Sequence, residues 1–397
     1  METTLWGELV PGPFAVGFRT SLTTDYSRYY GPPRGEPGSS RHFRPIFIAI
    51  WYPAIAPATG ASPLTYGDYL HVSPNEDEAA FAPFLERLRA YLRDITIQYG
   101  LEKKPEELDE AGRQELADRE RLPSRALRHA PSAGEGRFPI VFYHPGLGGS
   151  YEDNALLCEY LASHGYFVVS SAYQPEDATS LHVDWDLDRS IKDLGFLMNF
   201  VAADPLADVT RVGAVGQSYG GQALLAWSSE TNCPVRAVVS LDSTLDYAEP
   251  DDPGFARLRE PLSRAHNVAA AWLLFAVKER KPNWSRWDYL IHTPRWLAET
   301  GPLGHDDFTA QGMIGTVLRH GKATEAGLIR KRYEAVCGLT RRFLDGYVKQ
   351  ETEARVILMQ QATPEPAGTT SSPPPAASLS PSEPLLTLTH KPASPGP

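Results

Sequence analysis

The chain has 397 residues, of which 42% are hydrophobic and 22% are charged, so it can hold one large α/β domain with additions or two domains. The net charge is −11 and basic residues form no dense block, which argues against a nucleic-acid-binding protein. No run of about 18 apolar residues occurs, so we expect no membrane span.

The cysteines and the N-terminus give no strong functional signal. Cys158, Cys233 and Cys337 are widely spaced, which fits neither a metal site nor a disulfide framework, so we expect buried structural thiols. The first residues lack a basic segment followed by an apolar one. No signal peptide is therefore predicted and a cytoplasmic location is expected, with export left open if the true start lies upstream.

Two β-strands are predicted near the N-terminus. Residues 12–21 indicate an edge strand, and residues 44–53 indicate a more apolar strand that ends at Pro53. The stretch between them, residues 31–40, is rich in Gly and Pro and is expected to be a loop.

Residues 74–131 differ in pattern from their surroundings, and we interpret them as a helical insertion. Apolar side chains recur at helical spacing from Phe81 to Ile95, and charged residues such as Glu86 and Arg93 fill the other face. We expect this amphipathic helix to pack on the domain, and transient contact of residues 78–97 with a lipid surface is the alternative. The insertion is placed to act as a lid over one end of the sheet.

From residue 138 onward, strands and helices alternate, which predicts a mostly parallel central sheet flanked by helices. Strands are expected at 138–143, 166–173, 212–215, 235–241 and 268–277, the last being the final core strand. Helices are expected at 152–164, 186–203, 222–227 and 329–350.

The composition changes near residue 361. Ten of the chain's 35 prolines fall between Pro364 and Pro397, among Ser, Thr and Ala. Such a sequence cannot build a packed core, so we expect a disordered tail over 361–397 that follows a single domain over 1–360.

The segment from Gly216 to Gly220 matches G-x-S-x-G, a sharp strand-to-helix turn that exposes a nucleophilic serine. Ser218 must then adopt a strained backbone conformation, and the two glycines leave the space that side chains would fill. An apolar strand precedes the motif and a helix-compatible segment follows it. Ser218 is therefore the candidate nucleophile, and a tight packing turn with a structural serine is the alternative.

A glycine-rich loop, residues 144–149, follows the strand that ends at Tyr143. Consecutive glycines let backbone amides approach a substrate oxygen without hindrance. We expect the amides of Leu147 and Tyr219 to form the oxyanion hole, where the N-terminus of the helix after Ser218 also favours negative charge. His144 precedes the glycines and is expected to have a structural role.

An acid and a base follow Ser218 in the order that this fold uses. Asp242 ends the strand at 235–241, and His305 lies in a Gly-led loop after the last expected strand. Asp246 is the second choice for the acid, with Glu279 and Asp288 as further candidates. His292 and His320 are the rival bases. Together Ser218, His305 and Asp242 would hydrolyse an acyl compound through an acyl-enzyme, without metal or organic cofactor.

The chain resembles the platelet-activating-factor acetylhydrolase group within the α/β-hydrolases, the plasma type and its bacterial relatives. The matching segments span residues 12–310 and include the following: 12–17, 51–53, 144–149, 216–221, 241–242 and 305–308. The resemblance implies an α/β-hydrolase fold and a serine esterase that removes short acyl chains from phospholipids or similar esters. It also implies the roles of Ser218, Asp242, His305 and Leu147 given above.

The chain departs from that group in places that bear on the substrate. Gln217 stands where His is frequent, Pro145 enters the glycine loop, and the insertion and tail have no assigned counterpart. Dienelactone hydrolases are related but use a Cys nucleophile, so Ser218 argues against that activity. An amidase or peptidase with the same triad, or a binding protein on a hydrolase scaffold, remain as alternatives.

Overall fold

The computed structural model describes residues 5–30, 42–56, 62–73, 76–134, 136–174, 186–247, 253–290, 292–318, 323–364 and 384–394. The expected loop at 31–40 and the rival base His320 lie outside these residues. In the described part of the chain, no helix is both long and apolar enough to span a membrane.

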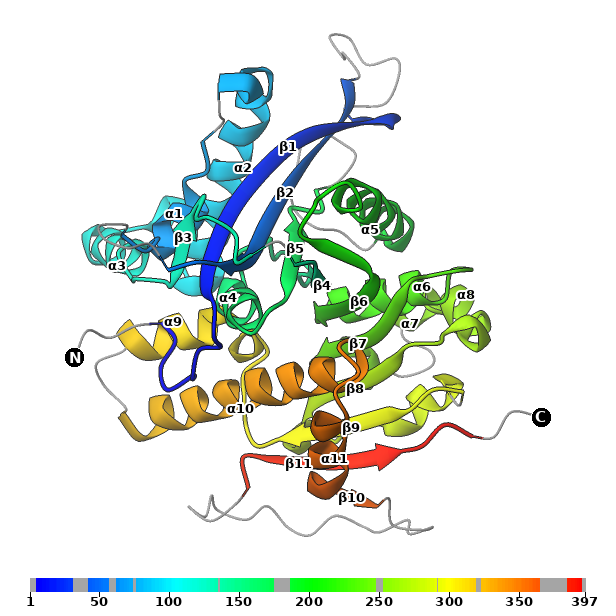
Figure 1. Ribbon diagram of the computed structural model, residues 1–397. Helices are drawn as coiled ribbons and strands as arrows, with labels where there is room; N and C mark the ends of the chain where they lie inside the picture. Colours follow the sequence, from blue (N-terminus) through cyan, green and yellow to red (C-terminus); the bar gives the residue numbers. More distant parts are fainter. Residues whose placement is uncertain are drawn as a thin grey trace.

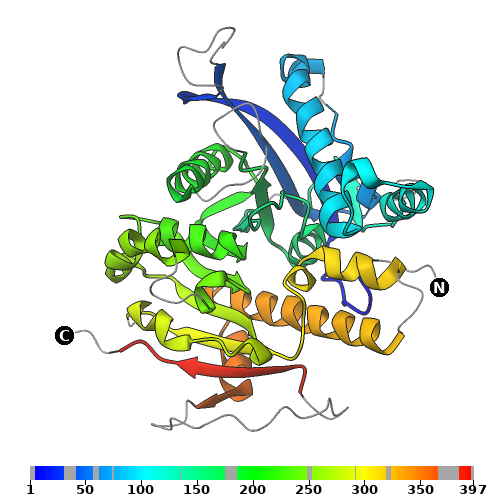
Figure 2. The same cartoon turned by 180° about the vertical axis from the view of Figure 1, so that it is seen from behind.

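One mixed sheet runs through the molecule (Figures 1 and 2). Its strands are β1 (Ala15–Tyr30), β2 (His42–Ala54), β3 (Ala126–Arg128), β4 (Phe138–His144), β5 (Phe167–Ser171), β6 (Ala207–Gln217), β7 (Val235–Leu241), β8 (Ala271–Val277), β9 (Arg295–Thr300), β10 (Ala362–Pro364) and β11 (Leu386–Lys391). Their order across the sheet is β10-β11-β9-β8-β7-β6-β4-β5-β2-β1-β3.

The centre of the sheet is parallel and its margins are mixed. Strands β5, β4, β6, β7, β8 and β9 pair in parallel, β2 is antiparallel to both β5 and β1, and β11 is antiparallel to β9. This confirms the expected α/β-hydrolase fold with a mostly parallel sheet. Parallel strands bring their carboxyl ends to one edge, and loops that leave this edge are where such sheets build their sites.

Both faces of the central strands are buried, as parallel strands covered by helices require. Along β4, Val141 packs into one hydrophobic cluster and Phe142 into the other. The first cluster includes residues of α4 (Ala155–Ser163), α9 (Ala310–Leu318) and α10 (Ala323–Tyr347). The second includes residues of α5 (Leu187–Val201) and α6 (Tyr219–Ser228).

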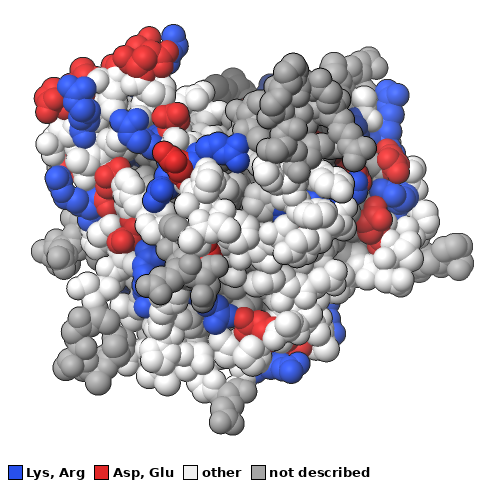
Figure 3. Space-filling model, turned by 90° about the horizontal axis from the view of Figure 1, so that it is seen from above, with Lys and Arg blue, Asp and Glu red and all other residues white. Residues whose placement is uncertain are grey.

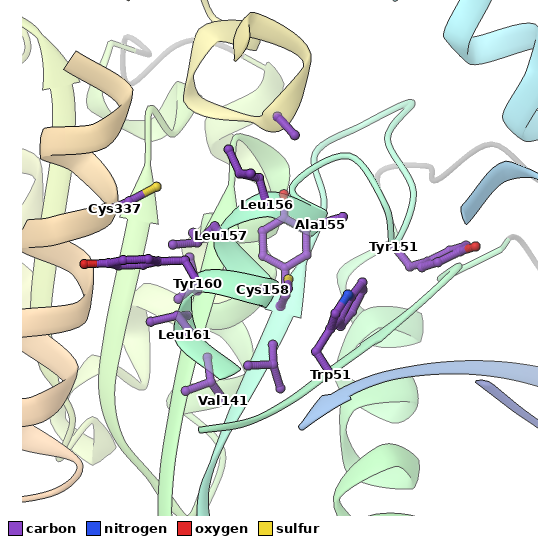
Figure 4. Packing of buried hydrophobic residues seen from close by; sticks show 14 of the residues in the cluster. Trp51, Val141, Tyr151, Ala155, Leu156, Leu157, Cys158, Tyr160, Leu161 and Cys337 are labelled. Carbon is purple, nitrogen blue, oxygen red and sulfur yellow. The ribbon is translucent and has the colours of Figure 1, made fainter. Parts of the chain in front are cut away.

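The cluster around α4 holds two of the three cysteines. Cys158 on α4 and Cys337 on α10 are buried, and Figure 4 shows both among aromatic and aliphatic side chains such as Tyr160 and Leu157. Burial raises the pKa of the Cys337 thiol, which keeps it protonated. The expectation of buried thiols is confirmed for these two, whereas Cys233 is partly exposed.

The segment expected as a helical insertion contains η1 (Glu76–Phe81), α2 (Ala82–Ile95), the π-helical turn η2 (Thr96–Gly100), η3 (Pro105–Glu107) and α3 (Glu110–Glu120). It follows α1 (Tyr66–Leu70), lies beside β1 and β2, and contacts α9 through α3 (Figures 1 and 2). The apolar stripe of α2, from Phe84 to Ile95, is buried in the core. The amphipathic helix therefore packs on the domain.

Two expectations for the second half need correction. The strand at 268–277 is not the last core strand, because β9 follows it and pairs with it in parallel. β9 is short and has Arg295 and Glu299 among its six residues, which weakens its apolar signal.

The tail over 361–397 is not disordered throughout. Residues 361–364 form the end of α11 (Thr352–Gln361) and β10, and β11 adds to the sheet with Leu388 buried. Residues 365–383 and 395–397 lie outside the described part. Over the described residues of the face in Figure 3, basic and acidic side chains are intermixed and form no extended basic patch.

Candidate active site

The turn between β6 and α6 has the geometry of a nucleophile elbow. Ser218 has φ 53° and ψ −119°, a strained conformation for a residue with a side chain. A methyl group on Gly216 would collide with the backbone of Gly220, and one on Gly220 would collide with the His144 carbonyl. The Ser218 amide donates to the Leu241 carbonyl at 2.9 Å, which ties the elbow to the end of β7.

Asp242 and His305, which are 63 residues apart in the chain, meet beside this turn. Asp242 follows β7 and His305 precedes η8 (Asp306–Phe308), so both leave the carboxyl edge of the sheet. His305 Nδ1 donates to Asp242 Oδ2 at 2.6 Å, with the carboxylate fully buried and the imidazole 39% exposed. With Nδ1 protonated, Nε2 is the nitrogen that can act as a proton acceptor.

Two further side chains, missed at the sequence level, hold Asp242. Arg280 Nη1 donates to Asp242 Oδ2 at 2.5 Å and its Nη2 to the Leu303 carbonyl at 3.2 Å. The Tyr247 hydroxyl donates to Asp242 Oδ1 at 2.7 Å and accepts from the Val277 amide at 2.9 Å. Arg280 lies just after the carboxyl end of β8, and this place is the sequence feature that could have pointed to it. Lys278, Glu279 and Lys281 lie at the same strand end, so the place alone does not single out Arg280.

The contact of the base with the nucleophile is not formed in this structure. Gln217 Nε2 lies 3.2 Å from His305 Nε2 and 3.4 Å from the His305 carbonyl oxygen. Among the described residues, no hydrogen bond joins Ser218 Oγ to His305. The Gln217 amide thus takes the lone pair that a serine proton would need.

The rival acids and bases have other partners or surroundings. Asp246 accepts from Trp287 Nε1 at 2.6 Å, and burial raises its pKa well above the ordinary value. Asp288 pairs with Arg295 at 3.0 Å. Glu279 and His292 are exposed. Within the described part of the chain, Asp242 is the carboxylate that contacts His305.

The loop 144–149 lies beside the elbow. A methyl group on Gly146 would overlap Gln217 Oε1, so the Gln217 side chain would have to move, and Gly148 has φ 75°. His144 is buried, with Nδ1 at 2.8 Å from the Pro145 carbonyl and Nε2 at 3.0 Å from Ser190 Oγ. Burial lowers its pKa to about 4, so it stays neutral and fits the expected structural role.

Two cavities adjoin His305. The smaller one, of about 70 Å³, is lined by Leu147, Gly148, Gly149, Gln217 and His305 together with residues of α2, η2 and the start of α9. The larger one, of about 620 Å³, lies between η2, α3, the 304–307 loop, α9 and α10. They share Tyr99, His305, Asp306 and Gln311, so the insertion forms one wall of both.

Comparison with known proteins supports the fold. No family model matches the sequence, and neither does any curated protein. The structure is similar to that of a ferulic acid esterase from Streptomyces cinnamoneus, with a TM-score of 0.55 and 21% identity over 86% of this chain and 93% of that chain. A likeness at this identity shows the shared α/β-hydrolase fold and does not single out the platelet-activating-factor acetylhydrolase group.

Proposed function

We propose that this chain is a serine carboxylic-ester hydrolase. The observation that carries the proposal is the His305–Asp242 hydrogen bond, formed next to a serine in the strained conformation of a nucleophile elbow. The esterase named in the fold comparison is consistent with this reaction class. The roles of the individual residues below are part of the proposal.

In this mechanism Ser218 Oγ attacks the ester carbonyl carbon while His305 Nε2 takes its proton. Asp242 holds the imidazole and stabilises its cation. The developing oxyanion accepts hydrogen bonds from the Leu147 and Tyr219 amides, each worth about 3 kcal/mol in the transition state. His305 then protonates the leaving alcohol, and water repeats the sequence in reverse on the acyl-enzyme. Gln217 must first release His305 Nε2.

The decisive experiment compares hydrolysis of p-nitrophenyl acetate by the wild-type protein and by Ser218→Ala. We expect a loss on the order of a million-fold in kcat, because the nucleophile is removed. Ser228→Ala is the matched control, because it removes a hydroxyl of the helix that follows Ser218, and this hydroxyl donates to the Leu225 carbonyl. Equal rates for wild type and Ser218→Ala would exclude the proposed chemistry.

The contact of Gln217 with His305 also favours a second candidate, a non-catalytic binding protein on the same scaffold. A fluorophosphonate probe separates the two. Labelling of wild type that disappears in both Ser218→Ala and His305→Ala supports the hydrolase. No labelling of the wild-type protein supports the binding protein.

The substrate that we propose is a short-acyl ester, with platelet-activating-factor-like phospholipids as one class. The cavity of about 70 Å³ beside His305 can take a short acyl group. Turnover should fall as the acyl chain grows from acetyl to long chains. Repeating this series of esters with and without lipid vesicles tests whether residues 78–97 contact lipid. Anilides run in parallel test the amidase alternative.

A further inference from the structure

The turn that carries His305 is held on both sides. Before the base, Arg280 Nη2 donates to the Leu303 carbonyl at 3.2 Å. After the base, in η8, the Phe308 carbonyl accepts from Asn154 Nδ2, also at 3.2 Å. Asn154 belongs neither to the elbow nor to the loop that bears the acid, so its contact with this turn has no role in the mechanism described so far.

Each end of the Asn154 amide is hydrogen-bonded, and the residue is fully buried. Its Oδ1 accepts from the hydroxyl of Tyr333 on α10 at 2.6 Å, and Tyr333 is fully buried as well. A backbone carbonyl can only accept a hydrogen bond, so the contact with Phe308 fixes Nδ2 on the side of η8. The side chain therefore bridges α10 and η8 in one orientation.

A role in starting a helix does not account for this side chain. Asn154 occupies the N-cap position of α4, where Asn is a preferred residue because its side-chain oxygen can accept from a backbone amide of the first turn. Here the side chain makes no such hydrogen bond, and the backbone, with φ −125° and ψ 35°, is not in the extended conformation usual for a cap. The buried amide serves η8 instead of its own helix.

The backbone joins the same two segments at a second point. The Asp153 carbonyl accepts from the Ala310 amide at 2.8 Å. Residues 153–154 come shortly after the glycine loop 144–149, and residues 308–310 come shortly after His305. The two hydrogen bonds thus attach the turn of the base to the segment that follows the expected oxyanion loop. Alignment at such a junction matters, because a misplacement of about 1 Å can cost about 100-fold in rate.

We propose that Asn154 is a positioning residue for the base: through the Phe308 carbonyl it holds η8 so that His305 Nε2 can reach Ser218 Oγ. The inference rests on the proposed function and adds a residue to its machinery. Without the amide, the Ala310 hydrogen bond keeps η8 attached, but the turn can shift and the imidazole is less often in line with the serine. Proton transfer then slows, whereas binding of the ester is unchanged.

The test is Asn154→Ser, whose hydroxyl is too short to reach η8 and which takes no capping hydrogen bond from α4. With p-nitrophenyl acetate we expect kcat about tenfold lower and KM within about twofold of the wild type. The rate constant of fluorophosphonate labelling should fall by the same factor, because labelling needs the same base. A smaller folded fraction would lower the amplitude of labelling and leave its rate constant unchanged, which separates positioning from a loss of stability.

Two further variants complete the design. Asn267→Ser is the matched control, because it removes an Asn donor to the Ser229 carbonyl at 3.2 Å, ahead of the amino end of β8 and thus at the opposite edge of the sheet. Its rate constants should equal those of the wild type. Tyr333→Phe removes the other hydrogen bond of the Asn154 side chain and should slow labelling about threefold.

Each outcome decides the proposal. Wild-type kcat and labelling rate in Asn154→Ser, or a raised KM with unchanged kcat, would overturn the positioning role and leave the esterase intact. An equal fall in Asn267→Ser would overturn it too. If Asn154→Ser does not fold, Tyr333→Phe decides in its place, and unchanged labelling there counts against the role. If the wild type neither hydrolyses p-nitrophenyl acetate nor reacts with the fluorophosphonate, the proposed function itself fails.

Discussion

Arg280 is the residue whose position next to the acid has the clearest consequence for catalysis. It shares Asp242 Oδ2 with His305 and also holds the Leu303 carbonyl in the loop that carries the base. A cation at this place competes with the imidazolium for the carboxylate. In Arg280→Gln the carboxylate and the loop both lose this partner, so kcat/KM for p-nitrophenyl acetate should fall about tenfold.

Arg280→Lys is the control for this change. It keeps the positive charge and a donor for Asp242, so its kcat/KM should lie between those of the wild type and Arg280→Gln. Equal kcat/KM in the wild type and Arg280→Gln would show that Arg280 does not position the acid.

Gln217 leads to a prediction about reactivity without substrate. Its amide donates to the lone pair of His305 Nε2 that Ser218 needs. Gln217→Met keeps the length and removes the donor. The variant should react with a fluorophosphonate about fivefold faster, which corresponds to one neutral hydrogen bond of about 1 kcal/mol. Gln217→Asn, whose amide is too short, should behave likewise. Slower labelling in both would show that the amide supports the base.

These residues mark what sequence reasoning could and could not reach. The elbow motif and the chain order predicted Ser218, Asp242 and His305, and the structure brings the last two into contact. Arg280, Tyr247 and Gln217 act through side-chain geometry at the meeting point of three loops. No spacing in the sequence encodes that geometry.

At the scale of elements, the central strands were predictable because they are apolar on both faces, as for 235–241 and β7. The expectation of disorder over the whole tail is wrong because it rests on the Pro-rich composition, which hides a short strand pattern within the tail. Residues 386–391, Leu-Thr-Leu-Thr-His-Lys, alternate apolar and polar residues and form β11. Period-two alternation in a Pro-rich segment could have identified this strand.

β11 covers the edge of β9, and its removal from the sheet should destabilise the protein. Leu388 is 5% exposed and packs into the first hydrophobic cluster. Leu388→Asp buries an unpaired carboxylate and should lower the free energy of unfolding by about 3 kcal/mol, measured by urea denaturation. Thr387→Asp, at the exposed neighbouring position, is the control. Similar losses in both would show that β11 contributes little.

At the scale of the whole molecule, the alternation of strands and helices along the sequence was enough to predict the fold. The cavities could not be predicted from it. They form where residues 95–119 of the insertion meet residues 304–316 and the first turns of α10, which are far apart in the chain. Two acids of the smaller cavity wall are buried, and burial raises the pKa of Glu152 to about 7 and that of Asp153 well above its ordinary value. The assembly of the site therefore affects the stability of the entire domain.

This burial predicts that the protein loses stability as the pH rises. Glu152 has an ordinary pKa of 4.5, so the folded state binds its proton more tightly than the unfolded state does. The resulting stabilisation is complete below the ordinary value and is lost as the pH rises through about 7. Burial is the cause that raises the pKa of Glu152, and the hydrogen bond from the Ser150 hydroxyl opposes this shift. The Glu152 carboxylate in turn raises the pKa of Asp153 and of Tyr66.

Glu152→Gln removes this titration and tests its size. Relative to wild type, the variant should gain about 2 kcal/mol in free energy of unfolding between about pH 5 and about pH 8, measured by urea denaturation at both. Glu353→Gln, on the exposed side of α11, should follow the wild type instead. If the wild type and Glu152→Gln change in parallel over this range, the Glu152 carboxyl ionises in the folded protein as easily as in the unfolded chain.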